Sequence, residues 1–140
     1  MDTARRFADL SSARRLHVGA IIVKDDRIIS IGYNGMPAGW DNNCEDESVE
    51  LYSGYEGAIH RTVLKTKPEV LHAETNAIAK LARSTESGLD ATMFITHAPC
   101  LDCATLIFQS GIRSVFYAED YRSDAGVQFL TKSNVDIKKV

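Results

Sequence analysis

The hydrophobic and polar positions of this chain follow a strand pattern near the N-terminus and alternating helix and strand patterns after residue 70. VGAIIVK (18–24) and RIISIGY (27–33) are rich in β-branched residues, and Asp25 and Asp26 between them fit a tight turn. Together these segments predict a β-hairpin. Before them, residues 2–15 carry apolar side chains at a rough helical spacing, which predicts an N-terminal helix.

The middle of the chain has a weaker pattern. Residues 34–47, NGMPAGWDNNCEDE, are dense in glycine, proline and asparagine and predict a loop. Residues 48–66 are ambiguous, and one interpretation is a short helix that is interrupted near Gly54 and Gly57. Pro68 then separates this region from the next element.

Three helices alternate with three strands from residue 72 onward. The helical segments are 72–84, 100–110 and 123–132, and the strand segments are 91–96, 113–119 and VDIKKV at 135–140. Strands that alternate with helices favour a parallel sheet covered by helices, and the opening hairpin should add an antiparallel strand at one side. We therefore expect a three-layer α/β fold, a five-stranded mixed sheet with helices on both faces, in a single domain over residues 1–140.

Composition and charge limit the classes of function. Of 140 residues, 44% are hydrophobic and 25% charged, and the net charge is −3, as in a soluble single domain. Acidic and basic residues are mixed, so we do not expect a long nucleic acid as partner. No apolar run approaches the roughly 20 residues of a membrane span. The first residues lack the apolar stretch of a secretory signal, so the expected location is the cytoplasm. Because that compartment is reducing and the number of cysteines is odd, we do not expect a disulfide framework.

Cys100 and Cys103 begin a predicted helix with i, i+3 spacing, so their sulfur atoms can converge on one point. The partial positive charge at a helix N-terminus favours the thiolate, which is the form that binds zinc. Two core cysteines or a redox pair are the alternatives. Because the chain has no second Cys-x-x-Cys pair, and a catalytic zinc takes three protein ligands plus water, we expect one histidine from a neighbouring helix start. His72 fits that position.

Glu74 follows His72 by two residues. H-x-E followed by P-C-x-x-C, with a strand between them, is the signature of zinc deaminases of nucleobases, in which the glutamate moves protons without binding the metal. Zinc makes hydroxide available near neutral pH, hydroxide attacks the amidine-like carbon, and ammonia leaves. The alternatives are a capping or solvent-exposed His72, and a Glu74 that only suits a helix N-terminus.

Over about residues 11–121, the sequence resembles the deoxycytidylate (dCMP) deaminase family of the cytidine deaminase superfamily. The matching segments are HAETNAI, APCLDC and VGAIIVKDDRIISIGYNGMPAG (18–39), together with Tyr121 in AEDYRSD. The zinc motif is shared by the whole superfamily. GYNG-x-P-x-G is closer to dCMP deaminases, and tRNA adenosine deaminases generally lack that loop.

The resemblance implies a cytidine deaminase-like fold and hydrolysis of dCMP to dUMP, the precursor of dTMP. In the family, the asparagine matching Asn34 contacts the deoxyribose and the tyrosine matching Tyr121 lies over the pyrimidine, and we add Ala73 and Ala98 to the expected substrate contacts. A turn role for Asn34 and a packing role for Tyr121 remain alternatives. Candidates for the substrate phosphate, for which a solvated surface role is equally open, are Arg14, Arg15 and Arg122.

The family further implies activation by dCTP with Mg²⁺, inhibition by dTTP, and an oligomer that is often a hexamer. Many relatives also hold a second, structural zinc. One cysteine ligand of that site is replaced here by Ala13, which argues against the site in this chain. Cys44 and His60 could still contribute to it, and the alternative is that Cys44 is an unligated loop thiol.

Two other functions stay open at this stage. One is deamination of another base, such as adenosine in tRNA or free cytidine, by the same zinc chemistry. The other is a nucleotide-binding regulator with an inactive deaminase fold. The intact Glu74 and the complete set of predicted zinc ligands argue against the regulator.

Overall fold

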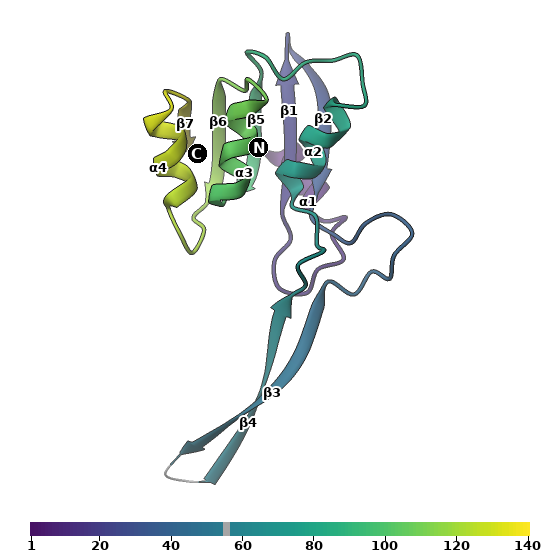
Figure 1. Cartoon of the computed structure of the whole chain (residues 1–140), viewed down its shortest axis with the longest axis vertical. Helices are drawn as coiled ribbons and strands as arrows, with labels where there is room; N and C mark the ends of the chain where they lie inside the picture. Colours follow the sequence, from purple (N-terminus) through teal and green to yellow (C-terminus); the bar gives the residue numbers. More distant parts are fainter. Residues whose placement is uncertain (55–56) are drawn as a thin grey trace.

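The computed structural model describes residues 1–54 and 57–140, and the side chains of those residues outside 52–59. Its main sheet has five strands in the order β2-β1-β5-β6-β7, and two more strands form a separate hairpin (Figure 1). The strands of the main sheet are β1 (Gly19–Lys24), β2 (Arg27–Tyr33), β5 (Thr92–His97), β6 (Ser114–Glu119) and β7 (Asp136–Lys139). The helices are α1 (Asp2–Ala8), α2 (Ala73–Leu81), α3 (Leu101–Gln109) and α4 (Ala125–Lys132). None of these helices in the described part of the chain has the length and apolarity to cross a membrane.

The opening hairpin forms as predicted. β1 and β2 are antiparallel, and the turn between them holds Asp25 at φ 49° and Asp26 at φ 57°. Two successive residues with positive φ give a hairpin turn whose twist matches that of the flanking strands. β1 also pairs antiparallel with β5, while β5, β6 and β7 are parallel to one another. The expected mixed sheet is therefore confirmed.

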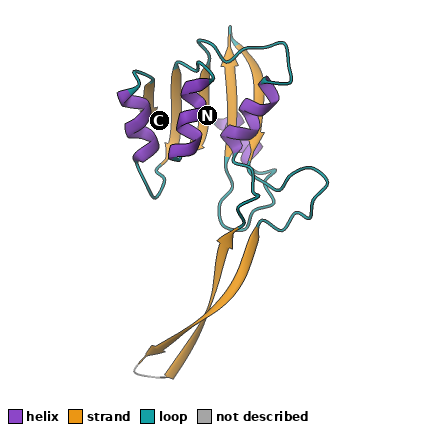
Figure 2. Cartoon of the chain, viewed as in Figure 1, coloured by secondary structure: helices purple, strands orange, loops and turns teal. Residues whose placement is uncertain are grey.

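Helices cover both faces of this sheet. A Cβ atom added at Gly32 would lie 2.0 Å from the carbonyl oxygen of Ala73 in α2, and one added at Gly19 would lie 2.0 Å from that of Ala4 in α1. Gly32 is opposite Ala20 in the strand register, next to Gly19, so the two glycines point to opposite faces. α3 contacts both α2 and α4. Figure 2 shows α2, α3 and α4 together on the near face of the sheet.

The main core fills the layer between the sheet and α2, α3 and α4. Buried residues of the sheet and of the helices meet there; among them are Ala20, Ile22, Met93, Ile95 and Val115 from the strands, and Ala77, Leu81, Ala104, Ile107 and Leu130 from the helices. Because this packing fixes α2 and α3 against β1 and β5, it also fixes the positions of their N-terminal ends.

The N-terminal helix is shorter than predicted, because it ends at Ala8 and not near residue 15. Beyond it, the Ser11 hydroxyl oxygen accepts the backbone N–H of Ala13. The carboxylate of Glu45 accepts the backbone N–H groups of Arg14 and Arg15. Side chains thus satisfy these backbone donors in a non-helical conformation, which the local spacing of apolar residues does not reveal.

The prediction for residues 45–66 was wrong. Strands β3 (Glu45–Gly54) and β4 (Gly57–Thr66) pair antiparallel along their whole length, where we expected a loop to residue 47 and considered a short helix beyond it. We call this hairpin the arm. It extends away from the main sheet (Figure 1). Val49 and Leu51 on it are 63% and 66% exposed, so at these described positions no buried core strengthens its period-two pattern.

Candidate metal centre

The N-terminal ends of α2 and α3 bring three potential metal ligands together. His72 is the N-cap residue of α2, and Cys100 is the N-cap residue of α3, both with extended backbone. The His72 Nδ1 atom lies 3.3 Å from the Cys103 Sγ atom and 3.7 Å from the Cys100 Sγ atom. All three ligand atoms lie within 4.8 Å of one another.

Neighbouring elements hold both helix starts in place. The His72 carbonyl accepts the backbone N–H of Asn76 at 2.9 Å, and the Asn76 side-chain amide donates to the carbonyl of Tyr33 at the end of β2. On the other side, a Cβ atom added at Gly126 in α4 would lie 2.1 Å from the Pro99 carbonyl and 2.8 Å from the Cys100 carbonyl. The backbone of α4 therefore supports the loop that carries Cys100.

The three side chains shift one another's pKa values. Hydrogen bonds from the Cys103 thiol and from the His72 ring lower the pKa of Cys100 to about 4. The hydrogen bond to the Cys100 sulfur, together with burial, raises the pKa of Cys103. The pKa of His72 is raised, chiefly by its hydrogen bond to Cys100. Thiolate and neutral imidazole are the forms that bind a metal, so a divalent cation would take the place of protons in such a cluster.

This donor set fits Zn²⁺. Two sulfurs and one imidazole nitrogen are common zinc ligands, and tetrahedral ligands about 2.0–2.3 Å from zinc lie roughly 3.3–3.8 Å from one another. The separations from the His72 nitrogen to the two sulfurs, 3.3 and 3.7 Å, agree with that geometry. Three protein ligands leave one position for water, which is the pattern of a catalytic zinc site.

Glu74 lies in the first turn of α2 and is only 4% exposed. Burial raises the pKa of its carboxyl group, because the charged form loses its hydration. It faces the same cavity as His72 and Cys100. A buried carboxyl group with a raised pKa beside potential metal ligands is suited to accept and donate a proton.

A cavity of about 100 Å³ opens beside the cluster. His72, Glu74 and Cys100 lie on its wall, and so do the four residues expected to contact a substrate, Asn34, Ala73, Ala98 and Tyr121. Cys103 is buried and is not among the lining residues. The Asn34 side chain accepts the backbone N–H of Val18 and donates to the Leu16 carbonyl, both at 2.8 Å, so it also fixes the entry to β1.

Sequence reasoning missed other residues of this wall. Glu45 and Thr66 face each other across the root of the arm and both line the cavity. No sequence pattern near these two residues predicts that they line the cavity, because their position depends on the pairing of the arm strands. His97 also lines the cavity, and its place three residues before Cys100 at the end of a predicted strand is a signal that could have found it.

The three candidate arginines differ in what they contact. The Arg14 guanidinium forms ion pairs with Glu45 and Glu47. The Arg15 guanidinium donates a hydrogen bond to the hydroxyl of Thr66 at 2.9 Å. Although the Arg15 backbone N–H donates to Glu45, no carboxylate among the described residues forms an ion pair with the Arg15 guanidinium, which leaves its charge available beside the cavity. The Arg122 guanidinium lies 5.5 Å from the centre of the Tyr121 ring.

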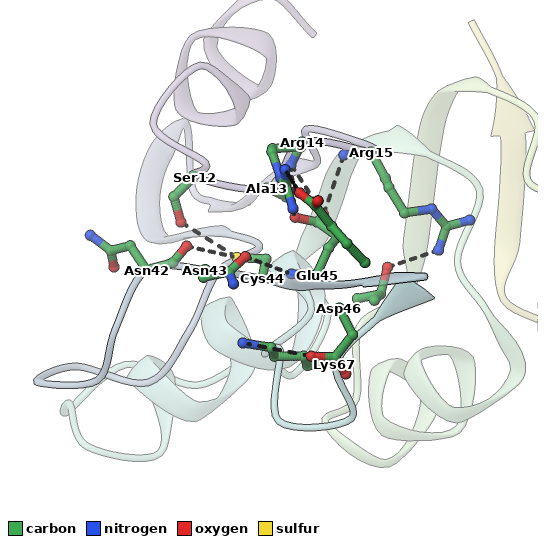
Figure 3. A network of polar contacts seen from close by, with 12 residues as sticks. Ser12, Ala13, Arg14, Arg15, Asn42, Asn43, Cys44, Glu45, Asp46 and Lys67 are labelled. Carbon is green, nitrogen blue, oxygen red and sulfur yellow. Dashed lines mark hydrogen bonds and ion pairs between the residues drawn. The ribbon is translucent and has the colours of Figure 1, made fainter. Parts of the chain in front are cut away.

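Cys44 does not take part in a second metal cluster within the described part of the chain. Its buried side chain packs with Ala13, Val70 and Met36, and its sulfur lies 3.4 Å from the Ser12 hydroxyl oxygen (Figure 3). His60 is exposed on β4, opposite Leu51 in the register. His72, Cys100 and Cys103 form the one group of potential ligands found among the described residues. The surroundings of the Cys44 side chain are thus largely apolar.

Comparisons with known proteins agree with this geometry. A family model described as the cytidine and deoxycytidylate deaminase zinc-binding region matches residues 1–119. ComE operon protein 2 of Bacillus subtilis (strain 168) is 37% identical over 131 residues, which cover 93% of this chain and 63% of that relative. The deoxycytidylate deaminase of Enterobacteria phage T4 is 39% identical over 131 residues, and the match covers 74% of this chain and 67% of that enzyme. The chain thus spans about two thirds of the length of these relatives.

A solved structure is similar over nearly the whole chain. The crystal structure of the dCMP deaminase from the cyanophage S-TIM5, in complex with dCMP and dUMP, matches with a TM-score of 0.84 and 38% sequence identity. The match covers 99% of this chain and 92% of that chain. This similarity confirms the expected fold class.

Proposed function

Because this chain belongs to the family of the cytidine and deoxycytidylate deaminase zinc-binding region, we propose that it hydrolyses dCMP to dUMP and ammonia within a single deaminase domain. The observation that carries the proposal is the buried Glu74 on the wall of a cavity that also exposes His72 and Cys100. The similarity to a dCMP deaminase crystallised with dCMP and dUMP supports this choice of substrate.

In this proposal His72, Cys100 and Cys103 hold Zn²⁺, which when bound lowers the pKa of water so that hydroxide is available near neutral pH. Glu74 accepts the proton of the attacking water. A C–O bond forms at C4 of the cytosine ring as Glu74 delivers this proton to the ring nitrogen, and Glu74 then transfers the proton of the new C4 hydroxyl group to the amine. The C4–N bond then breaks, and the nitrogen leaves as ammonia.

The remaining wall of the cavity positions the nucleotide. We assign Asn34 to the deoxyribose and Tyr121 to the pyrimidine, with Ala73 and Ala98 as close contacts of the base. Arg15 is the best candidate for the phosphate, because its guanidinium reaches Thr66 on the cavity wall and no acidic side chain among the described residues neutralises it. Arginine suits bidentate phosphate contacts.

The test is release of ammonia from dCMP by the zinc-loaded protein, with Glu74→Ala as the control. We expect Glu74→Ala to lose roughly 10²–10⁴-fold or more in rate, because it removes the general acid and base. Zinc content should stay unchanged, since Glu74 is not a ligand. Wild-type turnover in Glu74→Ala would refute the proposed role of Glu74. A preference for cytidine or a tRNA stem-loop over dCMP in parallel assays would refute dCMP as the substrate.

We further propose that the enzyme works in the cytoplasm, where its three free thiols stay reduced. The GYNGMPAG segment supports regulation by dCTP with Mg²⁺ as activator and dTTP as inhibitor, in a homo-oligomer that is a hexamer in many relatives. Initial rates with each nucleotide test the regulation, and sedimentation velocity of the full chain tests the assembly. Equal rates with and without both effectors would contradict the proposed regulation. A sedimentation coefficient that corresponds to a monomer would contradict the proposed oligomer.

A further inference from the structure

His97 has no part in the zinc cluster or the proton transfer described above, yet it lines the same cavity. It is the last residue of β5 and is half-buried. Cys100 follows it by three residues, so the two Cα atoms are at most about 10 Å apart. The imidazole of His97 therefore shares a cavity wall with Cys100, at the end of β5 that leads to the start of α3.

A chain of hydrogen bonds fixes which ring nitrogen of His97 carries the proton. The backbone N–H of Gly19 donates to the Thr96 hydroxyl oxygen at 3.1 Å, and that oxygen lies 3.1 Å from the His97 Nδ1 atom. Thr96 is only 5% exposed, so its own hydroxyl hydrogen needs an acceptor inside the protein. Among the described residues, Nδ1 of His97 is the acceptor within reach. Nδ1 therefore accepts, and the hydrogen of the neutral ring is on Nε2.

The surroundings of His97 keep the ring neutral. Burial lowers the pKa of His97, and the nearby Glu119 carboxylate only partly opposes that effect. A neutral ring with Nδ1 engaged has one remaining function, which is to donate a hydrogen bond from Nε2. Glu45 and Glu74 also line the cavity, and their ionised carboxylates can only accept hydrogen bonds. A neutral donor on the same wall can bind an oxygen atom of a ligand, which these carboxylates cannot do.

We propose that His97 is a substrate-binding residue whose Nε2–H donates a hydrogen bond to an oxygen of the nucleoside part of the nucleotide. The proposal rests on the proposed function of the cavity and deepens it. An oxygen of the base or sugar is favoured over the phosphate because His97 lies near Cys100, whereas the free guanidinium of Arg15 lies at Thr66 on the arm. Nucleosides have carbonyl and hydroxyl oxygens that can accept a hydrogen bond from such a donor.

Two variants test this with kcat/KM for dCMP and for deoxycytidine, which lacks the phosphate. His97→Gln places an amide N–H near the position of Nε2, and His97→Leu keeps a similar volume without a donor. We expect His97→Leu to lose about 3- to 10-fold in kcat/KM, and His97→Gln to recover most of the loss. The loss should be equal for both substrates. A loss confined to dCMP would mean that His97 contacts the phosphate and would overturn the proposal, as would a His97→Leu enzyme with wild-type kcat/KM.

A second readout is independent of turnover. Nitrogen chemical shifts of the His97 ring report which nitrogen is protonated, and we expect the Nε2–H form in the free protein. A ring protonated on Nδ1 would overturn the proposal. Zinc content of each variant should equal that of wild type. If wild type deaminates neither substrate, the proposed function fails, and calorimetric binding of dCMP to wild type, His97→Gln and His97→Leu then measures the contribution of His97 by itself.

Discussion

Glu74 illustrates at the residue scale how a group proposed for catalysis can oppose stability. Its carboxyl group is 4% exposed, and burial raises its pKa above the ordinary value of 4.5. Above that raised pKa, folding must bury a charge, which destabilises the native state. We expect Glu74→Gln, which is isosteric and neutral, to raise the Tm of the zinc-free protein at pH 8, while deamination falls by about 10²–10⁴-fold.

The raised pKa of Glu74 determines how the difference in Tm between Glu74→Gln and wild type changes with pH. The unfolded chain releases the Glu74 proton near pH 4.5, whereas the folded chain holds it to higher pH, so wild type loses stability relative to Glu74→Gln as pH rises through the raised pKa. Calorimetric scans at pH 5 and pH 8 should therefore show the larger difference in Tm at pH 8. A Glu74→Gln protein that melts below wild type at pH 8 would contradict the argument.

The sequence allowed us to predict the residues of the site that sit in short, local motifs. His72 and Glu74 at the start of α2, and Cys100 and Cys103 at the start of α3, are recognised from local spacing, and the alternation of helices and strands predicts that the two helix starts are neighbours. Glu45 depends instead on strand pairing with β4 and on backbone donors some thirty residues earlier in the chain. Such long-range partners leave no periodic signal, and for that reason they escaped prediction.

At the scale of elements, α4 supports the metal centre through its backbone. Gly126 lets α4 approach the carbonyls of Pro99 and Cys100, and a Cβ atom there would lie 2.1 Å from the first of them. We expect Gly126→Ala to push this loop outward and to weaken zinc binding by roughly 10- to 100-fold, as other changes beside metal ligands do. Competition with a chelator of known affinity measures the change.

Gly35→Ala is the matched control for this prediction. A Cβ atom at Gly35 would meet no atom closer than the Ser12 hydroxyl oxygen at 4.0 Å, and Gly35 does not need a positive φ. Zinc affinity should therefore remain at the wild-type value in this variant. Equal affinities in Gly126→Ala and Gly35→Ala would show that α4 does not hold the Cys100 loop.

The elements differ in how far the sequence predicts them. α2, predicted at 72–84, spans Ala73–Leu81, and α3, predicted at 100–110, spans Leu101–Gln109, because each buries an apolar stripe against the sheet. The arm has no such support. Among the described residues its strands pair only with each other. The alternation of Val49 and Leu51 with Ser48 and Glu50 is short, and it competes with an equally weak helical pattern.

At the scale of the whole molecule, the arm and the body are separate in their packing. The buried residues of the main core, among those that the structure describes, all lie outside the arm. Two-stranded hairpins are marginally stable by themselves, so the distal arm should add little to the stability of the body. The root is different, because the Glu45 carboxylate accepts the backbone N–H groups of Arg14 and Arg15.

Replacing residues 48–63 with Asn-Gly tests this division. Glu47 and Leu64 are opposite each other in the register, so a two-residue turn can join them without a shift in the strands. We expect the shortened chain to keep its zinc content and to melt within about 3 °C of wild type by calorimetry. Glu45→Ala in the full chain should lower Tm by about 5 °C or more, because it leaves backbone donors at the root without an acceptor. If the shortened chain instead fails to fold or to hold zinc, the distal arm is part of the cooperative unit that forms the site.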